Sequence, residues 1–350
     1  MQANSICIIR LSALGDICLF LPTLNALRRS FPNANVVWII GKAEAELIEG
    51  IDGVEPIVYD KKSGLAGMFA IGAKLKNRRF DYLLMAQEAL RASILSLFIR
   101  ADKRVGFDRD RAKDFQRLFT NAQIAPNPNC HMIENYLDFA RFLGADTGAI
   151  QYDLFIPDKA IREAEAIARG ESYCVVSPIA NAVRRNWRNW TIEGYAAAID
   201  YIYERYKLNA IVTGCQADRQ AAEAIARVAK APFINAVGKT SVKCLLALIK
   251  NARFTLAPDS GPGHFAAALS VPAIALLAAA DPRRAAPYQT PSYAVDRYRE
   301  ALLKYSGKTP EEVKFGRRVR HQKAMSEITI DDVTAMIDKA MRDSAATRKE

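Results

Sequence analysis

Short apolar runs alternate with amphipathic helical stretches twice along the chain, and this alternation restricts the fold more than any other feature. Consecutive β-α-β units build open, mostly parallel sheets, because each connecting helix returns the chain to the same end of the sheet. The sequence therefore predicts an α/β fold with two parallel sheets facing a central cleft. Each sheet presents a crevice at the carboxyl ends of its strands.

The expected elements form two series. In the first, strands are expected at 6–11, 36–40, 56–59, 82–86 and 104–106, and helices at 17–29, 43–49, 89–100 and 132–143. In the second, strands are expected at 173–177, 210–213, 233–235, 254–257 and 273–277, and helices at 192–206, 217–230, 241–250, 262–269 and 329–341. Pro22 falls in the first turns of its predicted helix, where proline is tolerated. Ser241 and the pair Thr329 and Asp332 are expected to cap helices.

Length and the break between the two series indicate two domains. A chain of 350 residues carries a prior of about two domains of roughly 150 residues each. The alternation pauses at 148–157, so we expect an N-terminal domain at 1–150 and a C-terminal domain at 151–350. The final helix, 329–341, is a candidate to pack back on the N-terminal domain.

The chain is basic, with a formal net charge of +11. Residues 74–117 hold twelve Lys or Arg against six Asp or Glu, and residues 297–323 hold nine against three. Such stretches suit an anionic partner, which is a nucleic acid, a membrane surface or a phosphorylated ligand. The alternative is two solvated basic faces. No signature of an RNA- or DNA-binding module is present, so we expect no nucleic-acid partner.

The six cysteines lack C-x-x-C spacing, and several lie inside apolar runs. They are expected to be small core residues in a reducing compartment. Arg10 and Asp16 interrupt the apolar N-terminus, so no signal peptide is expected. The longest nearly apolar run, 265–280, contains Pro272 and is shorter than the ~20 residues that span a bilayer. We expect a cytoplasmic protein with, at most, surface contact to a membrane.

The segment R-L-S-A-L-G-D at 10–16 joins the first predicted strand to the first helix. Gly15 permits a tight backbone at the crevice. Asp16 lies at the helix start, where the positive end of the helix dipole favours the ionised carboxylate. An ionised carboxylate in a cleft can take a proton from an acceptor hydroxyl. The alternative is that Asp16 only caps the helix.

The segment P-D-S-G-P-G-H at 258–264 also joins a strand to a helix. Its small residues let backbone N–H groups approach an anion, and a helix N-terminus favours phosphate. The dinucleotide-binding pattern G-x-G-x-x-G is absent here. Asp259 can orient the loop or bind a ligand hydroxyl, and His264 can donate to a phosphate. The alternative is a capped turn with a satisfied histidine.

A third segment, 184–190, interleaves arginine with tryptophan. Arg184, Arg185 and Arg188 are candidates to neutralise a diphosphate leaving group. Trp187 and Trp190 are candidate packing anchors for the next helix. The alternative is a basic face with structural tryptophans.

Three further patterns resemble functional motifs only in part. Residues 238–241 (G-K-T-S) resemble the end of a phosphate-binding P-loop, but Phe233 stands where the first glycine belongs. Asp108 and Asp110 resemble a pair that holds a metal–diphosphate complex, but their loop is strongly basic, and we expect solvated ion pairs. The three histidines are too far apart in sequence to show metal-ligand spacing, so we expect no metal.

Taken in order, these motifs resemble the lipopolysaccharide heptosyltransferase family, glycosyltransferase family 9. The segment R-L-S-A-L-G-D-I-x-L-x-L-P-x-L at 10–24 looks like the family's opening. The other matching segments are 87–92, R-V-G-F-D at 104–108, R-N-W at 188–190, G-K-T-S at 238–241, D-S-G-P-G-H at 259–264 and D-P-R-R at 281–284. The match covers residues 5–290, and its specificity comes from the order and spacing of the segments.

The resemblance implies two Rossmann-like domains in the GT-B arrangement, with the acceptor on the N-terminal side and the donor on the C-terminal side. It implies an inverting, metal-independent and cofactor-free transfer of heptose from ADP-heptose to an anionic lipopolysaccharide-core acceptor. The basic stretches fit such a glycolipid at the inner membrane surface. The enzyme would then work in the cytoplasm, peripheral on the inner face of the cytoplasmic membrane.

The resemblance also assigns roles to individual residues. Asp16 would be the general base. The donor-binding residues would be Arg188, Lys239, Thr240, Asp259, Ser260, Gly261, Gly263 and His264, and the acceptor-binding residues would be Ser12, Gly15, Gln87 and Arg91. Two alternatives stay open: a related glycosyltransferase with a different sugar nucleotide or glycan acceptor, and a non-catalytic sugar-nucleotide-binding protein on the same fold.

Overall fold

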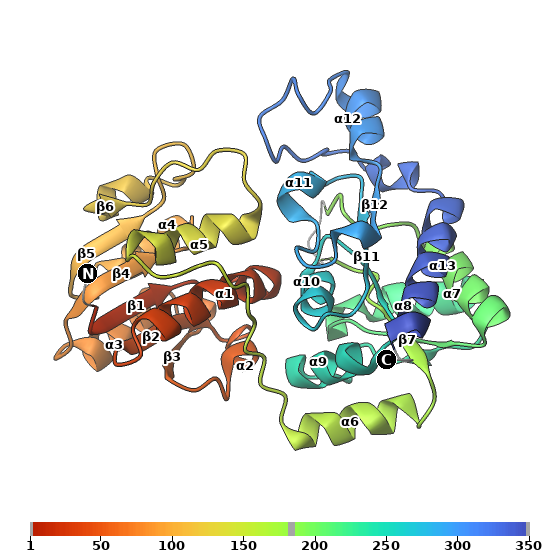
Figure 1. Cartoon of the computed structure of the whole chain (residues 1–350), viewed down its shortest axis with the longest axis horizontal. Coiled ribbons are helices and arrows are strands. Elements are labelled where there is room, and N and C mark those ends of the chain that lie inside the picture. The colour runs from red at the N-terminus through yellow and green to blue at the C-terminus, as the bar shows by residue number, and fades with distance from the viewer. Residues whose placement is uncertain (1–2, 181–185, 348–350) are drawn as a thin grey trace. The chain divides into compact units, whose positions relative to one another are not determined.

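Strand pairing sorts the chain into two parallel sheets. The computed structural model describes residues 3–180 and 186–347. Within these ranges each sheet has six strands, in the orders β3-β2-β1-β4-β5-β6 and β12-β11-β10-β7-β8-β9. The two orders are one topology, because the first and fourth strands of each series pair at the centre and the chain winds outward from them. The predicted α/β class with two parallel sheets is confirmed (Figure 1).

The first compact unit ends at Phe155, and the second begins at Ile156. The elements of the first unit are β1 (Ser5–Ile9), α1 (Leu14–Ser30), β2 (Asn35–Gly41), α2 (Ala45–Ile48), β3 (Val54–Tyr59), η1 (Lys61–Ser63), α3 (Gly64–Leu75), β4 (Phe80–Met85), α4 (Leu90–Ser96), β5 (Ala101–Gly106), η2 (Gln116–Phe119), β6 (Ala122–Gln123) and α5 (Met132–Phe142).

The second unit repeats this strand–helix alternation and adds a C-terminal helix. Its elements are α6 (Asp158–Ala168), β7 (Tyr173–Val176), α7 (Ile192–Tyr206), β8 (Asn209–Val212), η3 (Gln216–Asp218), α8 (Arg219–Val228), β9 (Ile234–Asn235), α9 (Val242–Asn251), β10 (Thr255–Pro258), α10 (Gly261–Ala268), β11 (Ala273–Leu277), α11 (Pro282–Ala285), η4 (Pro291–Tyr293), β12 (Ala294–Asp296), α12 (Tyr298–Ser306), η5 (Ala324–Glu327) and α13 (Ile330–Thr347).

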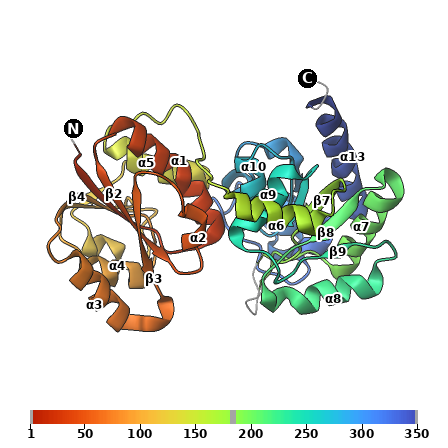
Figure 2. The same ribbon diagram turned by 90° about the horizontal axis from the view of Figure 1, so that it is seen from below.

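Helices cover both faces of the first sheet, which is why its central strands are apolar on both sides. On one face α1 packs against α5, and Phe20 of α1 contacts the rings of Trp38 and Tyr136. On the other face Met68 of α3 and Leu95 of α4 join the strand side chains in one buried cluster. Figure 2 shows the two helix layers on opposite sides of this sheet.

The second sheet is also covered on both faces. Helices α7, α8, α12 and α13 contribute to one buried cluster with alternate residues of β7, β8, β10 and β11. In this unit α13 packs against α7, β11 and β12, and Thr329 and Asp332 cap its start as predicted. Ser241 likewise caps α9 by accepting a hydrogen bond from the backbone N–H of Cys244 at 3.1 Å.

Several elements were not predicted. Helices α3, α6, α11 and α12 and the edge strands β6 and β12 fall in stretches where no regular element was expected. The interior of α3 contains two glycines, Gly67 and Gly72, which lower helix propensity. Helix α6 did carry a signal, because Ala160, Ala164 and Ala168 recur at helical spacing and are buried.

The predicted position of Pro22 within its helix is wrong. Helix α1 begins at Leu14, earlier than expected, so Pro22 is in its interior and buried rather than in its first turns. Proline has no N–H to donate, so one helical hydrogen bond is lost at this point. Burial of the surrounding apolar face against the sheet and α5 stabilises the helix despite that loss.

The cysteines divide into two groups. Cys7, Cys18, Cys174 and Cys244 are buried, as predicted. Cys130 is half-buried and Cys215 is exposed, so the prediction that all six are core residues is wrong. Both follow strand or loop ends at the surface, where local sequence apolarity does not report burial.

Charged residues interrupt the longest helix of the described residues. This helix, α13, has 18 residues, and Asp331 and Asp332 lie in its first turn. Across 3–180 and 186–347, no helix is both long and apolar enough to cross a membrane.

Candidate functional site

The centre of the first sheet is its topological switch point, where β1 and β4 lie side by side and the chain winds away in opposite directions. In open α/β sheets, ligands bind outside the carboxyl ends of the strands at such a point. The segment Arg10–Asp16 follows β1, and Gln87 and Glu88 follow β4. The first predicted motif therefore lies at the position where this fold binds ligands.

Asp16 is held at this point by side chains from two other elements. Its Oδ2 atom lies 2.8 Å from Nη2 of Arg10, and its Oδ1 atom accepts a hydrogen bond from the phenol of Tyr136 at 2.8 Å. The backbone N–H of Ala13 also donates to Oδ2, at 3.3 Å. The Asp16 side chain keeps 33% of its surface exposed. A carboxylate that buried side chains orient and that is partly exposed to solvent can accept a proton from a bound hydroxyl.

The groups behind Asp16 are fixed in their charge states. Burial disfavours the charged guanidinium of Arg10, but Asp16, Tyr136 and Glu88 together outweigh burial and raise the pKa of Arg10. Burial, and then the same carboxylate, raise the pKa of Tyr136 well above its usual value. Arg10 is therefore a permanent cation and Tyr136 a permanent donor. The guanidinium carbon of Arg10 also lies 5.0 Å from the Tyr136 ring centroid.

Gln87 ties the two central strands together at their carboxyl ends. Its Oε1 atom accepts hydrogen bonds from the backbone N–H groups of Leu11 (3.1 Å) and Ser12 (3.2 Å). Gly15 lies inside the first turn of α1, so no left-handed backbone is needed there. Arg91 is exposed in the first turn of α4. The four residues expected on the acceptor side thus lie around one edge of one sheet.

The segment that follows β5 is held by buried polar groups. Asp108 is buried and pairs with Arg111, which also bonds to Asp138 at 2.7 Å and Asn135 at 2.9 Å on α5. The expectation of solvated ion pairing at Asp108 is therefore wrong, because Arg111 anchors it beneath the loop. Asp110, the other carboxylate of the predicted pair, is exposed.

The switch point of the second sheet lies between β7 and β10. Arg188 lies in the loop that follows β7, and Asp259 comes directly after β10. Nη1 of Arg188 donates to the backbone oxygen of Asp259 at 2.9 Å and to its carboxylate at 3.3 Å. The other N–H groups of Arg188 have no hydrogen-bond partner among the described residues. They remain available to an anion at this edge.

Asp259 is the centre of a small charged cluster. Besides Arg188, Nη2 of Arg318 lies 3.8 Å and Nε2 of His264 lies 4.0 Å from its carboxylate. His264 is buried in α10, whereas Arg318 is mostly exposed. The carboxylate orients these side chains around the start of α10. Arg318 was not singled out from the sequence, because only the fold brings it to Asp259.

The small residues at the start of α10 leave room for a ligand. Gly261 begins the helix, and Ser260 precedes it with its hydroxyl donating to the carbonyl of Pro258 at 3.1 Å. A methyl group added at Gly263 would meet its nearest neighbour only at 3.9 Å. The helix begins shortly after the carboxyl end of β10, and the N-terminus of a helix favours an anion.

The G-K-T-S turn follows β9, the outermost strand on its side of the sheet. Gly238 has a left-handed backbone with φ +73°. Nζ of Lys239 donates to the backbone oxygen of Asn235 at 2.9 Å, and Thr240 is half-exposed. Among the described residues, no hydrogen bond or ion pair joins Lys239 or Thr240 to the Asp259 cluster. The turn shares the carboxyl edge of the sheet with that cluster but stands apart from it.

The arginine–tryptophan segment is only partly described. Arg184 and Arg185 lie outside the described residues. Trp190 is buried, donates to the carbonyl of Ile328 at 3.0 Å and packs edge-on against Tyr195, so it is the packing anchor that was predicted. Trp187 is partly buried against the same cluster.

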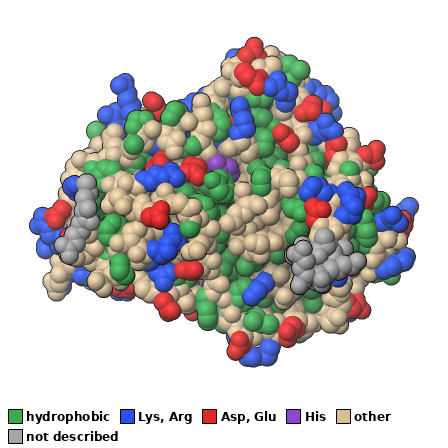
Figure 3. All heavy atoms as spheres, in the orientation of Figure 1, with side chains coloured by type: hydrophobic (Ala, Val, Ile, Leu, Met, Phe, Trp, Pro, Cys, Tyr) green, Lys and Arg blue, Asp and Glu red, His purple; other side chains and the backbone are tan. Residues whose placement is uncertain are grey.

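Ion pairs neutralise part of the second basic stretch. Arg297 pairs with Glu300 and Asp332, and Lys304 pairs with Glu327 at 2.8 Å. On the face drawn in Figure 3, many Lys and Arg side chains lie beside Asp or Glu side chains. The net charge therefore does not translate into a uniformly basic surface on that face.

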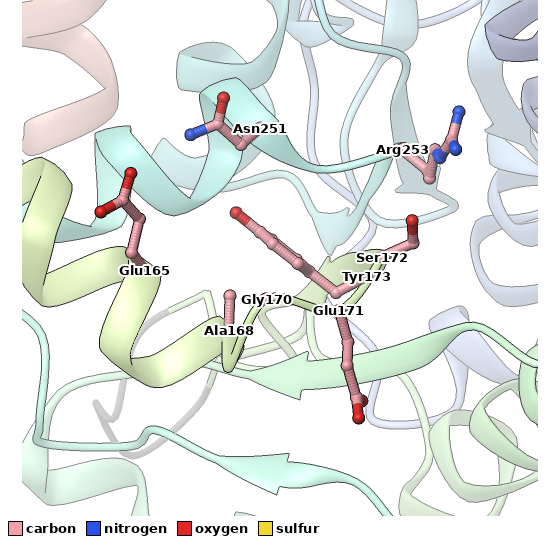
Figure 4. Close-up of a pocket in the computed structure, with 8 residues that line it drawn as sticks. All are labelled: Glu165, Ala168, Gly170, Glu171, Ser172, Tyr173, Asn251 and Arg253. Carbon is pink, nitrogen blue, oxygen red and sulfur yellow. The ribbon is translucent and has the colours of Figure 1, made fainter.

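A pocket of about 250 Å³ lies elsewhere in the second unit (Figure 4). It is lined by the end of α6, the start of β7 and the end of α9, including Glu165, Tyr173 and Asn251. This is the amino edge of the sheet, opposite the edge that carries Arg188 and Asp259. It contains no residue from the sequence motifs, and we do not assign the functional site to it.

Metal ligation finds no support in the side-chain arrangement. Within the described ranges, no group of three or more His, Cys, Asp or Glu side chains is placed to hold a metal ion. The candidate functional residues form two groups, one oriented carboxylate in the first unit and one Arg–Asp–His cluster in the second.

Comparisons with known proteins agree with one family. The sequence model of Glycosyltransferase family 9 (heptosyltransferase) matches residues 68–313. The lipopolysaccharide core heptosyltransferase OpsX of Haemophilus influenzae is 33% identical over 339 residues, which cover 96% of this chain and 96% of OpsX.

Solved structures share the fold. A glycosyl transferase family 9 structure from Veillonella parvula has a TM-score of 0.79 at 20% identity, covering 98% of each chain. The E. coli heptosyltransferase WaaC with ADP has a TM-score of 0.67 at 18% identity, covering 96% of this chain and 99% of WaaC. WaaC with ADP-2-deoxy-2-fluoro heptose has a TM-score of 0.64 at 17% identity, with the same coverage of the two chains.

Proposed function

Because this chain belongs to glycosyltransferase family 9, we propose that it transfers a heptose from ADP-heptose to an anionic lipopolysaccharide-core acceptor. It is a glycosyltransferase by family. The donor and acceptor are inferred from the relatives, since OpsX is a lipopolysaccharide core heptosyltransferase and WaaC was solved with ADP and with an ADP-heptose analogue.

One observation carries the proposal furthest. Each sheet has its motif residues at its own switch point, with Asp16 at β1–β4 and the Arg188–Asp259 pair at β7–β10. The first motif offers a base for an acceptor, and the second offers positive groups for a donor diphosphate. In this proposal the first unit is the acceptor-side domain and the second the donor-side domain.

The reaction proposed is a single displacement. The oxygen of the acceptor hydroxyl bonds to the anomeric carbon of the donor while Asp16 takes the proton of that hydroxyl. At the same time, the bond between the anomeric carbon and the diphosphate oxygen breaks. ADP leaves with the electron pair of that bond. The configuration at the anomeric carbon is inverted, because attack and departure occur on opposite faces.

The leaving diphosphate gains negative charge as the bond breaks. We propose that Arg188, Lys239 and Thr240, together with the start of α10 at Ser260, Gly261 and Gly263, bind the donor and stabilise that charge. His264 would donate a hydrogen bond to the sugar nucleotide, and Asp259 would hold Arg188 and His264 in place. Fixed cations then take the role that a metal ion has in other sugar transfers, so no metal is required.

On the acceptor side, we propose that Ser12, Gly15, Gln87 and Arg91 line the place where the acceptor sugar binds. The acceptor is anchored in a membrane, so the enzyme would act as a peripheral protein on the inner face of the cytoplasmic membrane. Arg91 is exposed beside this edge and suits the phosphates of such an acceptor.

The test is ADP release from ADP-heptose with a lipid A–Kdo acceptor, comparing the wild type with Asp16→Asn. Asparagine has the size of aspartate and keeps one oxygen that accepts hydrogen bonds, so this substitution should disturb the packing around Arg10 little. Acceptor-dependent release should fall by roughly 10²–10⁴-fold, while ADP binding is unchanged.

Three results would overturn the proposal or part of it. Full activity of Asp16→Asn would remove Asp16 as the base. Donor binding by the wild type without release on any lipopolysaccharide-core acceptor would leave a sugar-nucleotide-binding protein, and release with a different sugar nucleotide would leave a related glycosyltransferase.

A further inference from the structure

Exposed apolar side chains concentrate on one part of the first unit. Seven of the ten large hydrophobic side chains that are exposed in the described structure lie between Val58 and Leu118. Six side chains of this region, on or beside α3, α4 and η2, are called the α3–α4 face here: Leu65, Phe69, Leu97, Phe98, Phe115 and Leu118. Phe115 is 75% and Leu118 81% exposed. Single exposed apolar residues are ordinary, but such a concentration marks an interaction surface.

Helix α3 is apolar on both of its sides. Met68, Ile71 and Leu75 face the core, as expected of a surface helix. The opposite side carries Leu65 and Phe69 rather than charged residues, and Lys74 is the only charged residue of the helix. A helix covering one face of a soluble sheet normally has a polar outer side.

The exposed Phe69 of α3 contacts the half-buried Phe98, which follows the end of α4. The rings of Phe69 and Phe98 meet edge to face, with centroids 4.8 Å apart. A methyl group added at Gly72 would lie 3.0 Å from Cβ of Phe98, so the two helices approach closely there. Figure 2 shows α3 and α4 next to each other beneath the sheet, on the side away from α1 and α5.

The third part of the face, η2, packs against α4. Between Phe115 and Leu118, the buried Gln116 donates to the backbone oxygens of Met85 (2.8 Å) and Gln87 (3.2 Å). The α3–α4 face is therefore connected directly to the edge where Gln87 and Asp16 lie, within one unit.

Basic residues predominate around this face, although the exposed Asp114 lies next to Phe115 in the chain. The segments 61–79, 89–100 and 115–119 together contain nine Lys or Arg and no Asp or Glu. Some of these pair with acids outside the segments, as Arg78 does with Glu55 at 2.5 Å. Lys74, Lys76, Arg91, Arg100 and Arg117 make no ion pair with any described residue. An apolar centre with unpaired cations around it complements a surface that is apolar within and anionic outside.

We propose that the α3–α4 face docks on an anionic phospholipid membrane, with Leu65, Phe69, Leu97, Phe115 and Leu118 entering the lipid surface and the surrounding Lys and Arg contacting phosphates. The apolar side chains contribute hydrophobic binding, which salt does not screen. The cations contribute electrostatic attraction to the lipid phosphates, which salt does screen. The purpose of this docking rests on the proposed function. Docking through the α3–α4 face would present a membrane-anchored acceptor beside Gln87 and Asp16.

The test is sedimentation of the full chain with vesicles of phosphatidylethanolamine and phosphatidylglycerol, which requires no transfer activity. The variant is the triple substitution Leu65→Ser, Phe69→Ser and Leu118→Ser. Its matched control is Val228→Ser with Leu303→Ser, which removes exposed hydrophobics from the second unit. Vesicle affinity of the triple variant should fall by at least about tenfold, whereas the control should bind as the wild type does.

Two further measurements separate the sources of binding. High salt should weaken vesicle binding of the wild type but not abolish it. The binding that remains at high salt should be absent in the triple variant. Transfer to a deacylated, water-soluble acceptor should be equal in the wild type and the triple variant, which also shows that the variant folds. If transfer fails but the face controls vesicle binding, the membrane inference stands and the proposed function falls.

Three outcomes would overturn the inference. One is equal vesicle binding by the wild type and the triple variant. Another is complete loss of wild-type binding at high salt, which would mean that cations alone bind. The third is a wild-type dimer that the triple variant converts to a monomer while vesicle binding is unchanged, because the face would then be covered by a second copy of the chain.

Discussion

The phenol of Tyr136 donates a hydrogen bond to Oδ1 of Asp16 across 2.8 Å, although 120 residues separate the two in sequence. Tyr136 is fully buried on α5, and Asp16 is partly exposed on the first turn of α1. Packing of α5 on α1 therefore sets the direction in which the carboxylate points. Arg10 holds the second oxygen, so both oxygens of Asp16 are oriented by buried groups.

We expect Tyr136→Phe to change the pH dependence of transfer more than its maximum rate. A hydrogen bond to the ionised carboxylate favours the ionised form, so losing it disfavours the form that can accept a proton. The acid limb of the kcat/KM profile should move to higher pH by about one unit, since a hydrogen bond to a charged group contributes about 1.5–3 kcal/mol and one pH unit corresponds to about 1.4 kcal/mol.

Tyr195→Phe is the matched control for this variant. Tyr195 is also fully buried, but its hydroxyl has no hydrogen-bond partner in the described structure. Removing that hydroxyl should leave the pH profile unchanged. If Tyr136→Phe gives the wild-type profile as well, Tyr136 does not position the base.

Arg188→Ala should weaken ADP binding by about tenfold to a hundredfold, because a hydrogen bond to a charged group contributes roughly 1.5–3 kcal/mol. The loss also leaves the Asp259 carboxylate, 9% exposed, facing the phosphates without its nearest cation. Titration calorimetry with ADP measures the effect. Arg227→Ala, which removes an exposed arginine from α8 in the same unit, should bind ADP normally. Equal affinity in both variants would exclude Arg188 from the donor site.

Arg111→Ala should destabilise the first unit by about 3–5 kcal/mol, because one buried carboxylate loses its only ion pair with a described residue and a second keeps only Arg141. Those carboxylates are Asp108, which is 5% exposed, and Asp138, which is 7% exposed. Urea unfolding measures the change in free energy. The neighbouring Arg109 is exposed, so Arg109→Ala should change the stability by less than about 0.5 kcal/mol. A loss of stability below about 1 kcal/mol for Arg111→Ala would show that the network is not a structural anchor.

Asp332 makes stability depend on pH at the acid end. Its hydrogen bond with Arg297 lowers the pKa of Asp332 to about 2. A lowered pKa in the folded state contributes stability above the unfolded pKa of about 4, and this stability is lost as the pH falls toward 2. Arg297 is 37% exposed, so solvent screening limits the contribution to about 1 kcal/mol.

Asp332→Asn should therefore unfold more easily than the wild type at pH 7, and the two should converge as the pH falls through this window. Chemical unfolding across the window measures the difference. Asp331→Asn is the control, because Asp331 is exposed and has no ion pair with a described residue. A constant difference between Asp332→Asn and the wild type at all pH values would contradict the assignment to this ion pair.

Much of the fold could be predicted from local pattern. All five predicted strands of each unit are present in the structure, and the central ones, such as β1, β2 and β4, are buried on both faces and appear as continuous apolar runs. The short edge strands β6 and β12 were missed, because two or three residues carry no periodicity. Helix α3 was missed because its glycines and its apolar outer side conceal the usual amphipathic pattern.

The candidate site divides in the same way. Sequence alone determined the two parallel sheets, the positions of Asp16 and Asp259 at strand ends, and the family that these motifs resemble, because each depends on residues close together in the chain. Only the tertiary structure joined Tyr136 to Asp16, Arg318 to Asp259, and α3 to α4 in one exposed apolar face. These relationships depend on which helices pack together across a sheet, and packing brings together residues whose sequence separation carries no local signal.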